Sequence, residues 1–118
     1  MMRVYVVEDD ADTRYFVTWL LTSMTGHEVS SFPSAEDALE VIRLRQPSIL
    51  LTDLNLPGLS GESLAQAALR LPAPPRIVLM SSDLKRLEAA RGLASSLLRK
   101  PFSIDEVLSV FEEPSEDS

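Results

Sequence analysis

Short apolar runs that are typical of buried strands alternate with amphipathic helical segments along the whole chain. The predicted strands are Met2–Val7, Glu28–Phe32, Ser48–Thr52, Arg76–Met80 and Ser96–Leu98. Helices are predicted over Asp12–Met24, from the N-cap Ser34 onward, over Glu62–Leu71 and Leu84–Leu93, and from Ser103 to about Phe111. Because parallel strands need crossover connections, this alternation predicts an α/β fold with a single doubly wound, five-stranded parallel sheet and helices on both faces.

Two local patterns make this prediction more specific. The segment Glu28–Phe32 is more polar than the other strands, so we expect it at or near an edge of the sheet. Ser103 and Glu106 have the spacing of a capping box at the start of the last helix. In the first helix, apolar residues recur at helical spacing and are expected to form one inward face, made of Phe16, Val17, Leu20, Leu21 and Met24.

The composition fits one folded domain. A chain of 118 residues with 45% hydrophobic and 25% charged residues can build a single core. The net charge of −7 argues against direct nucleic-acid binding, and the absence of cysteine excludes disulfides and thiolate zinc sites. No apolar run approaches the roughly 18 residues of a membrane span, and no signal-peptide pattern is present. We therefore expect a cytoplasmic protein with no membrane partner.

Acidic residues and a lysine follow three of the predicted strands. Glu8, Asp9 and Asp10 come after the first strand, Asp53 follows the third, and Lys100 follows the fifth. Ligands of open parallel sheets bind beyond the carboxyl ends of the strands, so we expect these side chains to meet at one edge. Carboxylate oxygens suit Mg²⁺, and this ordered set of residues is what Mg²⁺-dependent phosphoryl chemistry needs.

With these motifs in this order, the chain resembles the receiver domain of two-component response regulators from Arg3 to about Glu113. The matching motifs are Val6-Val7-Glu8-Asp9-Asp10 with Arg14 downstream, Thr52-Asp53-Leu54-Asn55-Leu56-Pro57-Gly58 with Gly61, Met80-Ser81-Ser82, and Lys100-Pro101-Phe102. The resemblance implies a flavodoxin-like (βα)5 fold, with a receiver domain over residues 1–113 and a disordered polar tail over residues 114–118.

The resemblance also implies roles for the polar residues. Asp53 is expected to accept a phosphoryl group, which a carboxylate can do once charge repulsion is neutralised. Lys100 is expected to pair with Asp53 at rest and with phosphoryl oxygens afterwards, and Ser81 to donate a hydrogen bond to the phosphoryl group. Asp10 is expected to open the first helix. The expected ligands of the Mg²⁺ cofactor are Glu8, Asp9, Asp53 and the backbone carbonyl of Asn55.

Each role has a plainer alternative. The acids after the first strand could merely cap the first helix, Ser81 could cap the fourth, and Lys100 could be a solvated lysine. Against the last alternative, the Lys-Pro bond is typically cis in this family, which would turn the lysine inward. Phe102 is expected to fill core. Lys85, Arg86 and Arg91 are expected to form a solvated face of the fourth helix.

Two features depart from the family pattern. Leu97 stands three residues before Lys100, where the family usually has tyrosine or phenylalanine. Lys100 follows Ser81 by only 19 residues, which is shorter than is usual, so the fourth helix is expected to be short or reoriented. Both departures put in doubt the common readout, in which the aromatic residue moves inward and the fourth and fifth helices form a dimer.

The resemblance suggests a partner surface as well. Tyr15 and Trp19 are i, i+4 neighbours, and exposed aromatic residues often anchor interfaces, although one ring could instead lie flat over the helix. With Pro101 and Phe102 they mark the face where phosphodonor domains dock in this family. The expected partner is a sensor histidine kinase or a histidine phosphotransfer domain, and the sequence does not name a downstream effector.

Three functions remain open at this stage. The leading hypothesis is a phosphoacceptor signalling domain that is not an enzyme beyond its own phosphorylation and dephosphorylation, with Asn55 and Asp83 beside the path of the hydrolytic water. The alternative is a phosphorylation-independent (pseudo-receiver) interaction module, which Leu97 favours and the complete polar set disfavours. A phosphatase with an aspartyl-phosphate intermediate is the third, and it lacks the usual Asp-x-Asp arrangement at Asp53.

Overall fold

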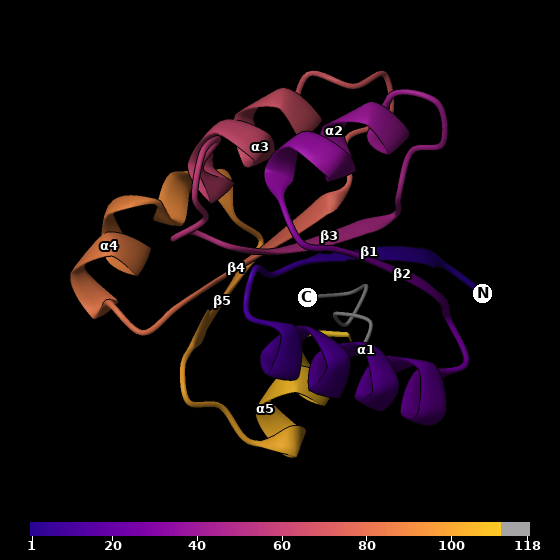
Figure 1. The fold of residues 1–118 in the computed structure, drawn as a ribbon, viewed down its shortest axis with the longest axis vertical. Helices are drawn as coiled ribbons and strands as arrows, with labels where there is room; N and C mark the ends of the chain where they lie inside the picture. Colours follow the sequence, from indigo (N-terminus) through magenta and orange to yellow (C-terminus); the bar gives the residue numbers. More distant parts are fainter. Residues whose placement is uncertain (112–118) are drawn as a thin grey trace, which may run out of the picture.

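One parallel sheet of five strands forms the centre of the protein (Figure 1), in the order β2-β1-β3-β4-β5. The structure is a computed structural model and describes residues 1–111. The elements in chain order are β1 (Arg3–Val7), α1 (Ala11–Thr25), β2 (Glu28–Phe32), α2 (Ala35–Ile42), β3 (Ile49–Asp53), α3 (Gly61–Ala68), β4 (Arg76–Ser81), α4 (Leu84–Ala89), the 3-10 turn η1 (Arg91–Leu93), β5 (Ser96–Arg99) and α5 (Ile104–Ser109). The predicted doubly wound α/β fold is confirmed.

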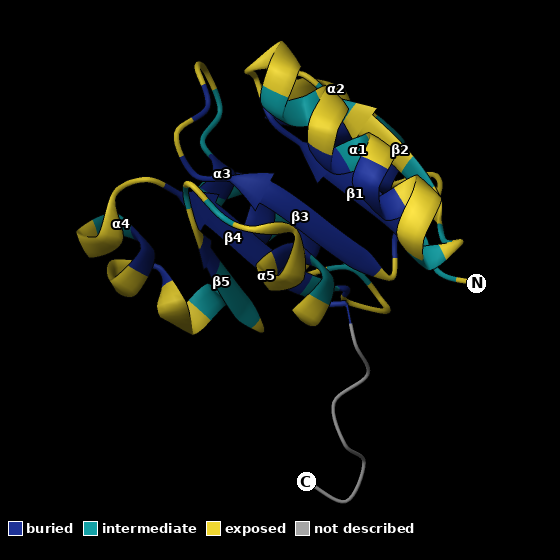
Figure 2. Cartoon of the chain, turned by 90° about the horizontal axis from the view of Figure 1, so that it is seen from below, coloured by how far each residue is buried: buried dark blue, intermediate teal, exposed yellow. Residues whose placement is uncertain are grey.

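Helices cover both faces of the sheet, so its strands are buried on two sides. Figure 1 shows α1 and α5 on one face and α2, α3 and α4 on the other. Successive residues of β1 point to opposite faces: Tyr5 and Val7 pack toward α2 and α3, whereas Val4 and Val6 pack toward α1 and α5. This double burial explains why the strand sequences show little polar alternation. Figure 2 shows the result, a buried sheet between helices that expose their outer sides.

The position of each strand matches its sequence. The central strand β3 is buried at every residue, and β2, which carries the more polar sequence, lies at an edge as predicted. Three strands, β3, β4 and β5, extend one residue beyond their predicted ends, because Asp53 pairs with Met80 and Ser81 pairs with Arg99 in the sheet. The ladder therefore fixes the backbone of Asp53 and Ser81.

Side chains cap the helices that begin near the carboxyl ends of the strands. Asp10, Ser34 and Asp83 each accept a hydrogen bond from the backbone N–H three residues ahead, at the starts of α1, α2 and α4. Ser103 and Glu106 form the predicted capping box of α5. The prediction that Asp10 opens α1 is thus confirmed, which leaves Glu8 and Asp9 for another role.

The predicted inward face of α1 is too wide. Val17, Leu20 and Leu21 are buried, but Phe16 and Met24 are exposed. Phe16 lies beside a surface cavity near Lys100, and Met24 lies beside a groove that Leu108 and Phe111 also line. Regular spacing shows which residues share a face, but the width of that face depends on how far the sheet and α5 extend beneath it.

The helices in the second half of the chain are shorter than predicted. The expected helix over Leu84–Leu93 is α4, of six residues, followed by the 3-10 turn η1. This agrees with the shortened segment between Ser81 and Lys100. The last helix ends at Ser109 rather than near Phe111. The predicted polar tail, residues 114–118, lies outside the described residues, and among the described helices none is long and apolar enough to cross a membrane.

Candidate functional site

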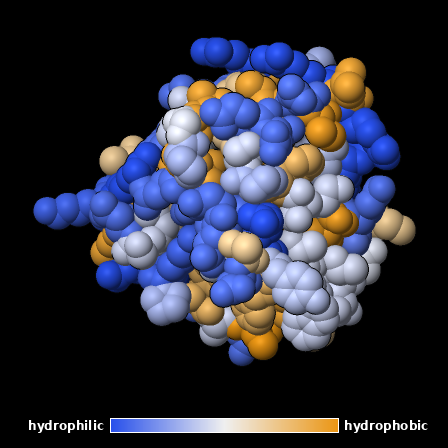
Figure 3. Space-filling view, viewed as in Figure 1, coloured by the Kyte–Doolittle hydropathy of each residue, from blue (hydrophilic) through white to orange (hydrophobic). Residues whose placement is uncertain are grey.

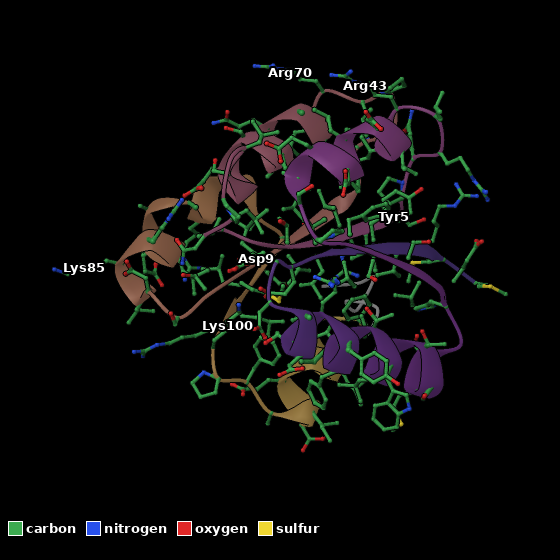
Figure 4. The ribbon with its side chains drawn as sticks, viewed as in Figure 1. Tyr5, Asp9, Arg43, Arg70, Lys85 and Lys100 are labelled. Carbon is green, nitrogen blue, oxygen red and sulfur yellow. The ribbon has the colours of Figure 1, made fainter. Side chains whose placement is uncertain are left out.

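The carboxyl ends of β1, β3, β4 and β5 bring the predicted polar residues to one edge of the sheet. Glu8 and Asp9 follow β1, Asp53 ends β3, Ser81 ends β4, and Lys100 follows β5. Figure 4 shows Asp9 and Lys100 near one another at this edge, between the sheet and α1. Residues that are separated by up to 92 positions in the chain thus share one site.

Three carboxylates form the centre of the site. Glu8, Asp9 and Asp53 each offer an oxygen, and these oxygens lie within 4.8 Å of one another. Glu8 and Asp53 are buried, whereas Asp9 is exposed. Two such charges about 5 Å apart repel by roughly 3 kcal/mol at an effective dielectric constant of about 20. The cluster therefore requires positive charge for its stability.

Lys100 supplies one positive charge. Its Nζ donates to Glu8 Oε1 at 2.7 Å and lies 3.4 Å from Asp53 Oδ2. The pair with Asp53 was predicted, but the shorter contact is with Glu8. Burial alone lowers the pKa of Lys100, but the hydrogen bond to Glu8 and the negative charge of Asp53 outweigh it and raise this pKa above its ordinary value. Lys100 is therefore charged and is not a solvated strand-end lysine.

Glu8 is the most deeply buried acid of the site. Burial raises the pKa of Glu8, while hydrogen bonds from Lys100 and from the backbone N–H of Asp10 partly oppose that rise. Its oxygen Oε2 accepts the Asp10 N–H, so Glu8 does hold the turn that leads into α1. The side chain that caps α1 is nevertheless that of Asp10.

Asp53 has one oxygen without a protein partner. Its Oδ2 lies near Lys100, but its buried Oδ1 has no hydrogen-bond partner among the described residues. A buried carboxylate oxygen is seldom left unpaired unless another group, an ion or water completes it. Together with the neighbouring oxygens of Glu8 and Asp9, the carboxylate of Asp53 fits a hard divalent cation.

Ser81 is held by two hydrogen bonds that it accepts. Asn55 Nδ2 donates to Ser81 Oγ at 3.1 Å, and the backbone N–H of Asp83 donates to the same oxygen at 3.0 Å. The side chain that caps α4 is that of Asp83, not that of Ser81. Ser81 is fully buried.

Arg86 belongs to the site, and its assignment to a solvated face was wrong. Its guanidinium donates through Nε and Nη2 to both carboxylate oxygens of Glu62 at 2.9 Å, and Nη2 also donates to the Leu54 carbonyl at 3.2 Å. Its Nη1 donates to Asn55 Oδ1. The hydrogen bond to Glu62 raises the pKa of Arg86, and the charge of Asp53 adds to this rise. Lys85, by contrast, points away from the protein (Figure 4).

Comparison with known proteins identifies the family. A family model described as the response regulator receiver domain matches residues 4–112. The chain belongs to this family.

Relatives and solved structures agree with this assignment. The receiver chain is 34% identical over 112 residues to the DNA-binding transcriptional regulator NtrC of Proteus hauseri, in a match that covers 92% of the chain and 24% of NtrC. It superposes with a TM-score of 0.82 on a CheY-like response regulator receiver domain from Methylobacillus flagellatus, at 28% identity, covering 95% of the chain and 99% of that structure. NtrX from Brucella abortus gives a TM-score of 0.85 at 27% identity, over 93% of the chain and 26% of NtrX. The chain thus spans about a quarter of the length of NtrC and NtrX.

A surface cavity lies next to the lysine of this receiver domain. It has a volume of about 530 Å³ and opens between α1 and the segment after β5. The Lys100-Pro101 peptide bond is cis, and Phe102 is half-buried against the core beside α1 and α5. The residues that line the cavity are Asp12, Thr13, Phe16, Ser82, Lys100, Pro101 and Phe102.

The unusual leucine of this receiver packs against the core. Leu97 is half-buried and packs against the cluster on the α2, α3 and α4 side of the sheet. It pairs with Leu79 in the ladder between β4 and β5. A leucine at this place presents neither a ring nor a hydroxyl to the surface, so a readout based on an aromatic residue is absent at this position.

Proposed function

We propose that this receiver domain accepts a phosphoryl group on Asp53 from the phosphohistidine of a sensor histidine kinase or a histidine phosphotransfer domain. The observation that carries the proposal is the environment of Asp53. One of its oxygens lies 3.4 Å from a charged lysine, and its other oxygen is buried without a partner beside two more acids. A nucleophilic carboxylate needs this combination of a fixed cation and an oxygen that is not already engaged in a hydrogen bond.

In the proposed reaction, an oxygen of Asp53 forms a bond to phosphorus while the bond between phosphorus and the donor histidine nitrogen breaks. The released imidazole keeps the electron pair of that bond and takes a proton from water. Lys100 would stabilise the negative charge on the phosphoryl oxygens, and Ser81 would donate a hydrogen bond to one of them. Water later attacks the phosphorus, the bond between phosphorus and the Asp53 oxygen breaks, and inorganic phosphate leaves the free carboxylate, with Asn55 and Asp83 beside the path of the water.

The residues present fit Mg²⁺ as the cofactor. Glu8, Asp9 and Asp53 would hold it, together with the backbone carbonyl of Asn55. When bound, Mg²⁺ supplies positive charge that offsets the repulsion between the acids and the incoming phosphoryl group. Lys100 alone gives one positive charge against three carboxylates, which is why a second cation suits this site.

The test is direct labelling with acetyl phosphate in the presence of Mg²⁺ or of a chelator. We expect the wild-type chain to gain the mass of one phosphoryl group with Mg²⁺ and little without it, and peptide mapping to place the label on the segment that contains Asp53. Sensitivity to hydroxylamine would identify an acyl phosphate. A folded protein that gains no mass would refute the proposal and favour a phosphorylation-independent interaction module, the function that Leu97 favours.

We infer that the donor docks over α1 and the segment after β5. The cavity there exposes Phe16 next to Lys100 and Pro101, so a helix seated on it would lie close to the acceptor carboxylate. Trp19 and Tyr15 are both exposed on α1, and Figure 3 shows pale side chains of intermediate hydropathy over this helix. Tyr15 lines a separate cavity with Arg14 and Ser31, and exposed aromatic residues on a helix are typical anchors of a protein partner.

Trp19→Ala is expected to slow transfer from a donor domain about tenfold, because truncation of an aromatic anchor removes contact area from the interface. Labelling by acetyl phosphate should be nearly unchanged, since a small donor does not touch α1. Leu44→Ala is the matched control, because Leu44 is exposed but follows α2 on the opposite side of the sheet. If Trp19→Ala slowed labelling by the donor domain and by acetyl phosphate equally, a docking role for Trp19 would be contradicted.

The output of the domain is proposed to be contact with another protein. NtrC is named a DNA-binding regulator, but the match covers 24% of it, and the net charge of −7 of this chain disfavours direct contact with nucleic acid. A cytoplasmic location, where histidine kinases present their phosphohistidine, follows from the same proposal.

A further inference from the structure

A continuous chain of hydrogen-bonded side chains runs from Ser81 to the surface of α3. Ser81, at the end of β4, accepts from Asn55 in the loop after β3. Asn55 accepts from Arg86 of α4, and Arg86 is paired with Glu62 of α3. Four segments of the fold therefore converge on the amide of Asn55 or on the guanidinium that holds it.

Arg86 determines which way the Asn55 amide faces. A guanidinium has only donors, so the atom of Asn55 that meets it must be the oxygen Oδ1. The amide nitrogen Nδ2 is then left to face Ser81, 3.1 Å away. Without a donor at position 86, nothing in this contact would distinguish the two ends of the amide.

The orientation of Asn55 in turn fixes the direction of the Ser81 hydroxyl hydrogen. A hydroxyl has two acceptor positions and one donor. Both acceptor positions of Ser81 are used, by Asn55 Nδ2 and by the backbone N–H of Asp83. The hydrogen is therefore free to donate elsewhere, which is the state that a hydrogen bond to a phosphoryl oxygen needs.

Glu62 keeps the guanidinium in the required position. It binds Nε and Nη2 of Arg86 through both of its oxygens, and this fork-to-fork contact leaves Nη1 directed at Asn55. The Leu54 carbonyl accepts from Nη2 as well. Arg86 is thus fixed by Leu54, which precedes Asn55 in the chain, and by Glu62, which follows it.

We propose that Arg86 is a positioning residue for phosphorylation: by fixing the Asn55 amide, it keeps Ser81 a hydrogen-bond donor to the phosphoryl group. The inference rests on the proposed function of Asp53 and adds a residue outside the motifs that mark the family. If the amide turned over, Asn55 Oδ1 would accept the Ser81 hydrogen, and the phosphoryl oxygen would lose its donor.

The test is a double-mutant cycle on the rate of labelling by acetyl phosphate with Mg²⁺. Arg86→Met removes the donors and is expected to slow labelling about tenfold, because the Ser81 hydrogen is then shared between Asn55 and the phosphoryl oxygen. Ser81→Ala should slow labelling by at least as much. In the Ser81→Ala background, Arg86→Met should have no further effect, since no hydroxyl remains to be oriented.

Two further variants separate positioning from structure. Arg91→Gln is the matched control, because Arg91 pairs with Glu88 on the surface and has no contact with Asn55 among the described residues. Its labelling rate should match that of the wild type. Arg86→Lys retains a donor for Asn55 without the fork, and we expect it to recover part of the lost rate.

The outcomes separate this inference from the proposed function. A wild-type chain that labels normally, with Arg86→Met and Ser81→Ala effects that multiply in the double variant, would overturn the positioning role and leave the function of Asp53 intact. A folded wild-type chain that takes no label would refute both. All labelling rates are compared at saturating Mg²⁺, because the charge of Arg86 interacts with Asp53 and its removal changes the affinity for Mg²⁺ whether or not Arg86 positions Asn55.

Discussion

Lys100→Met is expected to lower the rate of phosphoryl labelling about 100-fold and to raise the affinity for Mg²⁺ about tenfold. The two effects have opposite signs because Lys100 is a cation bound among carboxylates. Its ammonium lies 2.7 Å from Glu8 and 3.4 Å from Asp53, so it would compete with a divalent ion for the same oxygens. During transfer, the same charge would stabilise the phosphoryl group. Methionine keeps the apolar stem and removes the charge.

Asp53→Asn provides the opposite case at the same site. Labelling should be lost completely, since an amide cannot form the acyl phosphate, and Mg²⁺ should bind about tenfold more weakly because one charge of the cluster is missing. The two variants thus share a loss of labelling but differ in the direction in which metal affinity changes. Intact mass measures the labelling, and titration calorimetry measures the affinity.

Lys85→Met is the matched control for both measurements. Lys85 is an exposed lysine on α4 that points away from the protein, so its removal should change neither labelling nor metal affinity (Figure 4). If Lys100→Met labelled at the wild-type rate, the lysine would serve only the resting protein. If it bound Mg²⁺ more weakly, competition between the two cations would be excluded.

The sheet and the polar edge could be predicted from sequence because both depend on local patterns and a general rule. The strand β3 is buried on both faces, and its sequence therefore begins with an uninterrupted apolar run over residues 49–51. Parallel strands of one sheet have their carboxyl ends at the same edge. Asp53 and Lys100 lie at or just after such ends, so they are expected at that edge together. No knowledge of packing was needed for this step.

The partners of each charged side chain at the edge could not be predicted. Lys100 was assigned to Asp53, but its shorter contact is with Glu8, at a separation of 92 residues. To decide which of two neighbouring acids pairs with the lysine, the positions of the side chains must be known, and the spacing of residues in the sequence does not provide them. The same holds for Arg86, whose pair Glu62 lies 24 residues away on another helix.

The exposure of Phe16 shows a further limit of periodicity. Phe16 has the spacing of the α1 core residues, yet 38% of its surface is exposed because it stands over the cavity beside Pro101. Hydrophobic spacing records a preference for apolar surroundings, whether these are core or an interface. The apolar surroundings of Phe16 are those of the proposed docking surface. The residue whose burial was wrongly predicted therefore lies in the same region of α1 as Trp19.

Gly61→Ala is expected to destabilise the protein by about 3 kcal/mol, which is at the upper end of the usual cost of adding a methyl group to a packed site. Gly61 begins α3, and its backbone N–H donates to the Leu54 carbonyl at 3.1 Å, which closes the loop after β3. A Cβ at this position would overlap the carbonyl oxygen of Asp53 and would lie 2.8 Å from the Leu54 Cα. These are backbone atoms, so no side chain can turn aside to make room.

The strain would reach the site because the backbone that must move is that of Asp53. Asp53 is held at the end of the central strand β3 by pairing with Met80, so the loop and α3 must shift against a fixed strand. Gly92→Ala is the matched control: a Cβ there meets no heavy atom of the described residues within 4 Å, and we expect a change below about 0.5 kcal/mol. Urea unfolding of both variants measures the difference. If Gly61→Ala were as stable as Gly92→Ala, the loop between β3 and α3 would have to adjust at little cost. The close contact of Gly61 with the backbone of Asp53 would then not constrain Asp53.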